Sequence, residues 1–153
     1  QPPGPECGVK AMTIAAILGG KGHEVVSIDG DRTVADAVAL LAGKRIGAVP
    51  VMSGGAVAGI FSERDVIYCL EREGAAALAR TVGEVMTAPA ITVSPGESVL
   101  AALALMTRRR IRHLPVVEGD TCIGLVSIGD LVKYRIERIE SEADAMRAYI
   151  QAV

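Results

Sequence analysis

The sequence predicts an α/β (α+β) protein built from two similar half-domains, each with the order strand, helix, strand, strand, helix, and with a C-terminal helix after them. Three observations lead to this fold class. A long segment recurs without a gap, each copy holds one helical pattern followed by two β-branched runs, and the last part of the chain carries a heptad pattern. The chain has 153 residues, which is enough to bury a sizeable core.

The internal repeat has a period of 65 residues, since the segment from Val26 to Asp65 (the first copy) aligns without a gap with the segment from Ile91 to Asp130 (the second copy). Such a repeat predicts two copies of one structural unit. The aligned identities include Val34 with Val99, Arg45 with Arg110, Pro50 with Pro115, Gly59 with Gly124, Ser62 with Ser127 and Asp65 with Asp130.

The elements of each copy are predicted from caps and apolar spacing. Thr33 and Ser98 are favoured N-cap residues, and each precedes a stretch with helical apolar spacing. Two short β-branched runs and a turn between them then predict a strand pair, and the serine after the pair begins a second helix. The expected helices cover 34–41 and 99–106, and the expected strands cover 48–52, 56–61, 114–117 and 122–126.

The C-terminal stretch departs from the repeat. Its apolar residues recur at alternating spacings of four and three, which is a heptad pattern. Two interpretations remain open: an amphipathic helix that lies on its own domain, and a contact between two copies of the chain. The pattern consists of Val132, Ile136, Ile139, Ala143, Met146 and Ile150.

Composition excludes several classes of protein. The net charge is −2 and aromatic residues make up 3%, so neither general attraction to nucleic acid nor base stacking is expected. No apolar run approaches the ~20 residues of a membrane-spanning helix. The three cysteines are widely separated and lack metal-ligand spacing, which favours reduced thiols in the cytoplasm. With two histidines and no GxSxG or HExxH motif, no catalysis and no metal site are expected.

The repeated serine and aspartate are the residues that suggest chemistry. A carboxylate can accept both hydroxyls of a ribose, and a serine at a helix N-terminus can meet a phosphate beside free backbone N–H groups. Ser62 with Asp65 and Ser127 with Asp130 therefore suit a nucleoside phosphate. The alternative is that both pairs only cap their helices. Their recurrence in register favours binding.

With these motifs on hand, the chain resembles a tandem pair of CBS domains (cystathionine β-synthase domains), the arrangement called a Bateman module, and it is most similar to stand-alone bacterial CBS-pair proteins. The resemblance covers nearly the whole chain after Met12. The most specific stretches are Ile46-Gly47-Ala48-Val49-Pro50-Val51, Ser62-Glu63-Arg64-Asp65, Val85-Met86-Thr87, Arg112-His113-Leu114-Pro115-Val116 and Val126-Ser127-Ile128-Gly129-Asp130.

The resemblance implies two βαββα halves that pack through their sheets, and clefts between them that take an adenosine ligand. AMP is the leading expectation, with ADP, ATP or NAD(H) as alternatives. Asp65 and Asp130 would hold ribose hydroxyls, with Ser62 and Ser127 near ribose or phosphate. The base would meet Val26, Ala48, Ile91, Pro115 and Val116. The family also implies a homodimer.

The phosphate-facing charge is asymmetric between the copies. Arg112-His113 aligns with Gly47-Ala48, and Arg64 aligns with Gly129, so a site that draws on both halves could combine Arg64 with Arg112 or His113. Lys21 lies in a Lys-Gly-His stretch that takes the place of Met86-Thr87 in this alignment, and it could reach a phosphate. The cluster 108–110 is expected to face solvent at a helix end.

The leading hypothesis is therefore an adenine-nucleotide sensor that signals to an unidentified effector protein by conformational change. The alternative is a ligand-independent dimerisation or interaction module with vestigial clefts. A nucleic-acid-binding or membrane-bound role is not expected. The expected organisation is a disordered or added N-terminal segment (1–11), a first CBS domain (12–80), a second CBS domain (81–135) and a C-terminal amphipathic helix (136–153).

Overall fold

The computed structural model describes residues 12–21 and 25–152 and confirms the predicted fold class. The segment expected to be disordered, residues 1–11, lies outside the described residues. The elements in chain order are α1 (Ile14–Lys21), β1 (Ile28–Asp29), α2 (Val34–Lys44), β2 (Ala48–Ser53), β3 (Ala56–Ser62), α3 (Glu63–Glu73), the 3₁₀ helix η1 (Gly74–Ala79), α4 (Val82–Val85), α5 (Val99–Arg109), β4 (His113–Glu118), β5 (Thr121–Ser127) and α6 (Ile128–Gln151).

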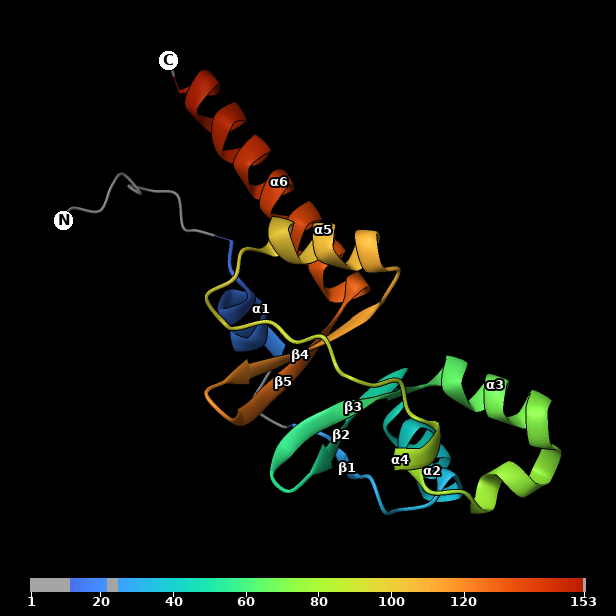
Figure 1. Ribbon diagram of the computed structural model, residues 1–153. Helices are drawn as coiled ribbons and strands as arrows, with labels where there is room; N and C mark the ends of the chain where they lie inside the picture. Colours follow the sequence, from blue (N-terminus) through green and yellow to red (C-terminus); the bar gives the residue numbers. More distant parts are fainter. Residues whose placement is uncertain (1–11, 22–24, 153) are drawn as a thin grey trace.

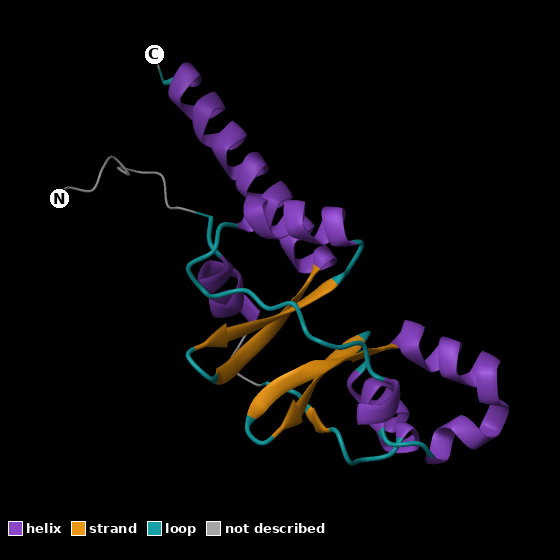
Figure 2. Ribbon diagram, in the orientation of Figure 1, coloured by secondary structure: helices purple, strands orange, loops and turns teal. Residues whose placement is uncertain are grey.

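Two small sheets lie in the middle of the molecule and helices cover their outer sides (Figures 1 and 2). In the first half, β1 pairs in parallel with β2, and β2 pairs antiparallel with β3. In the second half, β4 pairs antiparallel with β5. The two halves meet through their sheets, where β3 contacts β5. This is the packing that the resemblance implied.

The two copies agree residue by residue. Ala48 pairs with Ser62 in the first half and His113 with Ser127 in the second, and the pairing shifts register at Val51/Met52 and again at the equivalent Val116/Val117. The predicted N-caps are also confirmed, since Thr33 Oγ1 accepts a bond from the Asp36 N–H (3.1 Å) and Ser98 Oγ from the Ala101 N–H (3.0 Å).

The first strand of the second copy is reduced to a single bridge. Val93 pairs in parallel with Val116, and its N–H donates to the Pro115 carbonyl at 3.0 Å. In the first copy the Gly30 N–H extends the equivalent pairing by donating to the Met52 carbonyl, also at 3.0 Å. The residue aligned with Gly30 is Pro95, which has no N–H to donate. The predicted strand therefore ends after one bridge.

The two halves exchange their short preceding helices. Ile14 and Ile17 of α1, which precedes the first half in the chain, are buried in the hydrophobic core of the second half. Conversely, Val82 of α4, which precedes the second half, is buried in the core of the first. The sequence division at residue 80 gave α1 to the first domain by chain order alone. In space it packs with the second.

Helix α6 runs without interruption for 24 residues, so the boundary expected between residues 135 and 136 falls inside one helix. Its first turns pack on the second half, and its C-terminal part extends away from the body of the molecule (Figure 1). Among the described ranges 12–21 and 25–152, no helix is both long and apolar enough to span a bilayer.

Candidate functional site

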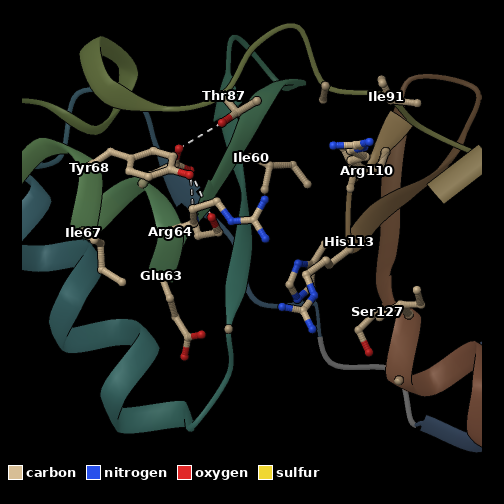
Figure 3. Close-up of a pocket in the computed structure, with 18 of the residues that line it drawn as sticks. Ile60, Glu63, Arg64, Ile67, Tyr68, Thr87, Ile91, Arg110, His113 and Ser127 are labelled. Atoms are coloured by element: carbon tan, nitrogen blue, oxygen red, sulfur yellow. Dashed lines mark hydrogen bonds between the residues drawn. The ribbon is translucent and has the colours of Figure 1, made fainter. Parts of the chain in front are cut away.

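A cleft of about 980 Å³ opens between the two halves. One wall is the start of α3 with β3, the opposite wall is the chain from Arg110 to His113 with the start of α6, and the segment that joins the halves closes one side (Figure 3). Its lining residues are Gly47, Ile60, Ser62, Glu63, Arg64, Asp65, Ile67, Tyr68, Thr87, Pro89, Ala90, Ile91, Arg110, Ile111, Arg112, His113, Ser127, Ile128 and Gly129.

Asp65 is the buried charged residue of this site, with 9% of its surface exposed. Its Oδ2 accepts hydrogen bonds from the Ser62 N–H (2.9 Å) and the Ser62 hydroxyl (3.2 Å), and its Oδ1 accepts one from the Thr87 hydroxyl (2.9 Å). The capping role that the sequence left as an alternative is therefore present. A carboxylate oxygen has more than one acceptor position, so these bonds leave acceptor capacity toward the cleft.

Asp130 caps α6 in the same way, but it does not line this cleft. Its Oδ2 accepts from the Ser127 N–H at 2.9 Å, and Ser127 Oγ accepts from the Asp130 N–H at 3.0 Å. Ser127 itself is a lining residue. The symmetry of the repeat is thus kept in the caps, while the cleft draws its carboxylate from the first half.

The segments that precede the two halves are equivalent at an offset of 68 residues rather than 65. The Val82 N–H donates to Arg32 O (2.8 Å), and the Ile14 N–H donates to Glu97 O (3.0 Å). Since Arg32 and Glu97 are equivalent in the repeat, Ile14 is the equivalent of Val82. A Cβ on Gly59 would touch Met86, and one on Gly124 would touch Leu18. Leu18, not Lys21, therefore takes the place of Met86, which corrects the position given to Lys21 and leaves the gap-free repeat from Val26 to Asp65 as it was. The place of Thr87 falls on Gly19, which has no hydroxyl.

The charge of the cleft favours an anion. Arg64 reaches in from the first half, and Arg110 and Arg112 line the second-half wall together with His113 (Figure 3). The acidic lining residues are Glu63 and Asp65. The N-termini of α3 and α6 both open into the same space, and each contributes a partial positive charge there.

Arg110 is exposed, as predicted for the cluster 108–110, and it also lines the open cleft. It adopts the left-handed conformation (φ 57°) as the C-cap of α5. Arg45 has the same conformation (φ 55°) at the equivalent position.

At one end of the cleft, side chains of the two halves meet at Gly47. A Cβ on Gly47 would lie 3.6 Å from Glu63 Oε1 of the first half and 3.6 Å from His113 Nε2 of the second. A larger residue at this position would reach into the space between them. The glycine thus keeps this end of the cleft open.

The structure brings together seven of the thirteen residues selected from the sequence: Ser62, Arg64, Asp65, Ile91, Arg112, His113 and Ser127. The others lie elsewhere. Ala48, Pro115 and Val116 are buried within β2 and β4, Val26 packs half-buried on the first core, and Asp130 caps α6. Lys21 is the last residue of α1, and its side chain lies outside the described part of the chain.

Sequence reasoning missed several lining residues. Thr87 had a visible signal, since it closes one of the motif stretches, but a role for it requires the contact with Asp65 across 22 positions. Ile67 and Tyr68 had a weaker one, because they are apolar or aromatic residues on the outward side of α3, where they remain 63% and 54% exposed.

Comparison with known proteins finds the same family in both halves. A model of the CBS domain matches residues 22–72 and again residues 82–137. These two matches coincide with the two copies seen in the sequence and in the structure.

Individual proteins agree with this match. The chain is 38% identical over 158 aligned residues to the Arabidopsis thaliana protein named CBS domain-containing protein CBSX3, mitochondrial, covering 95% of this chain and 75% of the other. A solved structure described as a putative signal-transduction protein with CBS domains, from Burkholderia ambifaria, is 41% identical, with a TM-score of 0.77 and coverage of 82% and 95%.

A third structure shares the fold at lower identity. The CBS domain pair of protein MJ0100, described in complex with 5′-methylthioadenosine and S-adenosyl-L-methionine, is 21% identical, with a TM-score of 0.75 over 84% of this chain and 99% of that one.

Proposed function

Because the chain belongs to the CBS domain family, as a tandem pair of CBS domains, we propose that it is a regulatory module that binds an adenosine nucleotide and signals its presence to a partner protein by conformational change. The observation that carries the proposal is the cleft between the halves, to which both halves contribute lining residues and a helix N-terminus. A ligand held by both walls stabilises one relative arrangement of the halves.

In this proposal Asp65 accepts the ribose hydroxyls, while Ser62 and Ser127 lie near the ribose or the phosphate. Arg64, Arg110 and Arg112 contact the phosphates, since guanidinium groups suit phosphate oxygens. Ile91 contacts the base with Ile60 beside it. Asp130 and Val26 would serve a second cleft related by the symmetry of the repeat, whereas Ala48, Pro115 and Val116 are buried within their strands.

The charge of the lining supports a phosphate-bearing ligand over a cationic one. Three arginines and two helix N-termini face two carboxylates, so a nucleotide gains attraction that S-adenosylmethionine, with its sulfonium charge, does not. We therefore keep AMP as the leading ligand, with ADP, ATP and NAD(H) as alternatives. At ~0.3 kcal/mol for each of about 23 heavy atoms, AMP would bind near 10 μM.

The proposed output is a change of shape rather than a reaction. Ligand binding biases the equilibrium between arrangements of the two halves, and a partner protein with different affinity for each arrangement reads the change. The proposed compartment is the cytoplasm, on the strength of the scattered cysteines alone, and microscopy of the tagged protein in its own cells tests it.

Isothermal titration with AMP, ADP, ATP, NAD, NADH and S-adenosylmethionine tests the binding. We expect the nucleotides to bind at micromolar concentration and Asp65→Ala to weaken binding roughly 10- to 150-fold, because it removes charge-assisted hydrogen bonds worth ~1.5–3 kcal/mol. The matched control is Asp36→Ala on α2, an exposed aspartate outside the cleft. Absence of binding by every compound would favour the alternative of a ligand-independent interaction module.

A further inference from the structure

Helix α6 carries an apolar stripe that the described residues, 12–21 and 25–152, leave exposed. The large side chains of the heptad pattern remain 43% to 65% exposed although they recur on one face of the helix. We call these residues, with Ala143, the α6 stripe: Val132, Ile136, Ile139, Ala143, Met146 and Ile150.

A different face of α6 attaches the helix to its own domain. Leu131 is fully buried in the second core, and Tyr134 packs against that core. Arg135 and Arg138 are partly buried on the same face, and Arg135 Nη1 lies 3.8 Å from Met12 Sδ. The stripe is therefore not needed to hold α6 on the body, and its C-terminal part lies on the section that extends beyond it (Figure 1).

We propose that the α6 stripe binds the α6 stripe of a second copy of this chain, as a parallel two-stranded coiled coil. The alternating spacing of four and three places Ile136, Ala143 and Ile150 at one core position of the heptad and Val132, Ile139 and Met146 at the other. In an in-register parallel pair, each of these six residues packs against the same residue of the second copy.

The charges beside the stripe fit this partner and this orientation. In heptad notation Ala143 is at position a and Met146 is at position d. In a parallel pair, the residue before an a position (position g) faces the residue after the following d position (position e) of the partner helix. Glu142 then faces Arg147 of the second copy. This contact is attractive, and the two-fold symmetry forms it twice.

An antiparallel pair with complete overlap of the stripe lacks this fit. Like positions face each other across its axis, so Glu142 would lie opposite Glu142 and Glu140 opposite Glu140. Slipping the helices to avoid these repulsions would leave Met146 and Ile150 outside the pairing.

Light scattering of the full chain without nucleotide tests the interface. We expect twice the 15.9 kDa mass of one chain at micromolar concentration, and a shift toward the single-chain mass for Ile139→Ser. Leu100→Ser on α5 is the matched control, since Leu100 is 52% exposed against 48% for Ile139 and lies outside the stripe. A wild-type monomer, or a dimer that Ile139→Ser leaves intact, overturns the proposal.

A charge exchange tests the orientation. Glu142→Lys and Arg147→Glu should each weaken the dimer roughly 10-fold, because each replaces two attractions by two repulsions, and the double variant should restore wild-type dissociation. Sedimentation equilibrium gives the dissociation constants, and circular dichroism checks that α6 keeps its helical content. Failure of the double variant to restore the dimer contradicts the parallel pairing.

Discussion

Thr87 links the segment that joins the two halves to the carboxylate that we place at the ribose. Its hydroxyl donates to Asp65 Oδ1 at 2.9 Å, and Asp65 is 9% exposed. The equivalent position before the first half is Gly19, which has no side-chain hydroxyl. Asp65 and Asp130 both accept from the N–H of the serine three positions before them, but only Asp65 has a threonine at this place.

We expect Thr87→Val to destabilise the protein by ~1–2 kcal/mol, since it leaves a buried carboxylate oxygen without its donor. Urea unfolding measures the change. Thr107→Val is the control, because Thr107 donates to Leu103 O on the exposed side of α5 and its loss should cost little. Equal effects of the two variants would show that the Thr87 hydroxyl adds nothing to the stability.

At the scale of elements, two equivalent glycines differ in how easily the atoms packed against them could move to admit a methyl group. A Cβ on Gly59 of β3 would lie 2.6 Å from the backbone oxygen of Thr87, whereas a Cβ on Gly124 of β5 would lie 2.7 Å from Leu18 Cδ2. A backbone atom in a pairing cannot yield easily, while the end of a leucine side chain can rotate.

We therefore expect Gly59→Ala to cost about 2–3 kcal/mol and Gly124→Ala less than about 1 kcal/mol. The two variants serve as controls for each other, since both add one methyl group to the same position of a repeated strand. Thermal and urea unfolding of the two variants measures their free energies of unfolding. A larger loss of stability in Gly124→Ala than in Gly59→Ala would contradict this prediction.

The elements of the repeat could be predicted because their signals are local. Thr33 and Ser98 cap where expected, and both strand pairs lie within a residue or two of their predicted bounds. Helix α1 could not be predicted in the same way. Its sequence has glycines at 19 and 20 and no one-sided apolar pattern, and its core contacts lie in the other half of the chain.

The site was predictable only where it follows the repeat. Asp65, Ser62 and Ser127 came from the recurring motif, and Arg64 and Arg112 came from its asymmetry. Arg110 and Thr87 depend on the path of the backbone between elements, which no local pattern in the sequence records. Asp130 shows the converse, since its motif is complete although the described cleft does not include it.

At the scale of the whole molecule, each half is completed by a helix that precedes the other. Ile14 of α1 and Val82 of α4 are both fully buried, the first in the second core and the second in the first. Truncating one of these side chains should therefore destabilise the half that buries it, which is not the half that follows it in the chain.

We expect Ile14→Ala to destabilise the protein by ~2–5 kcal/mol and to speed amide exchange first in β4 and β5. Val82→Ala, the reciprocal variant, should speed exchange first in β2 and β3. Hydrogen exchange followed by mass spectrometry assigns the loss to a half. Faster exchange in β2 and β3 of Ile14→Ala would contradict the exchange of helices.

The same exchange bears on how the chain folds during its synthesis. Helix α1 is translated before the first half, yet the surface that buries Ile14 and Ile17 includes Leu114, Val126 and Leu131, which are translated only with the second half. The first half, in contrast, is complete once α4 has emerged. The nascent protein therefore carries α1 as an unpaired apolar segment beside an already folded half until β4, β5 and α6 have been translated.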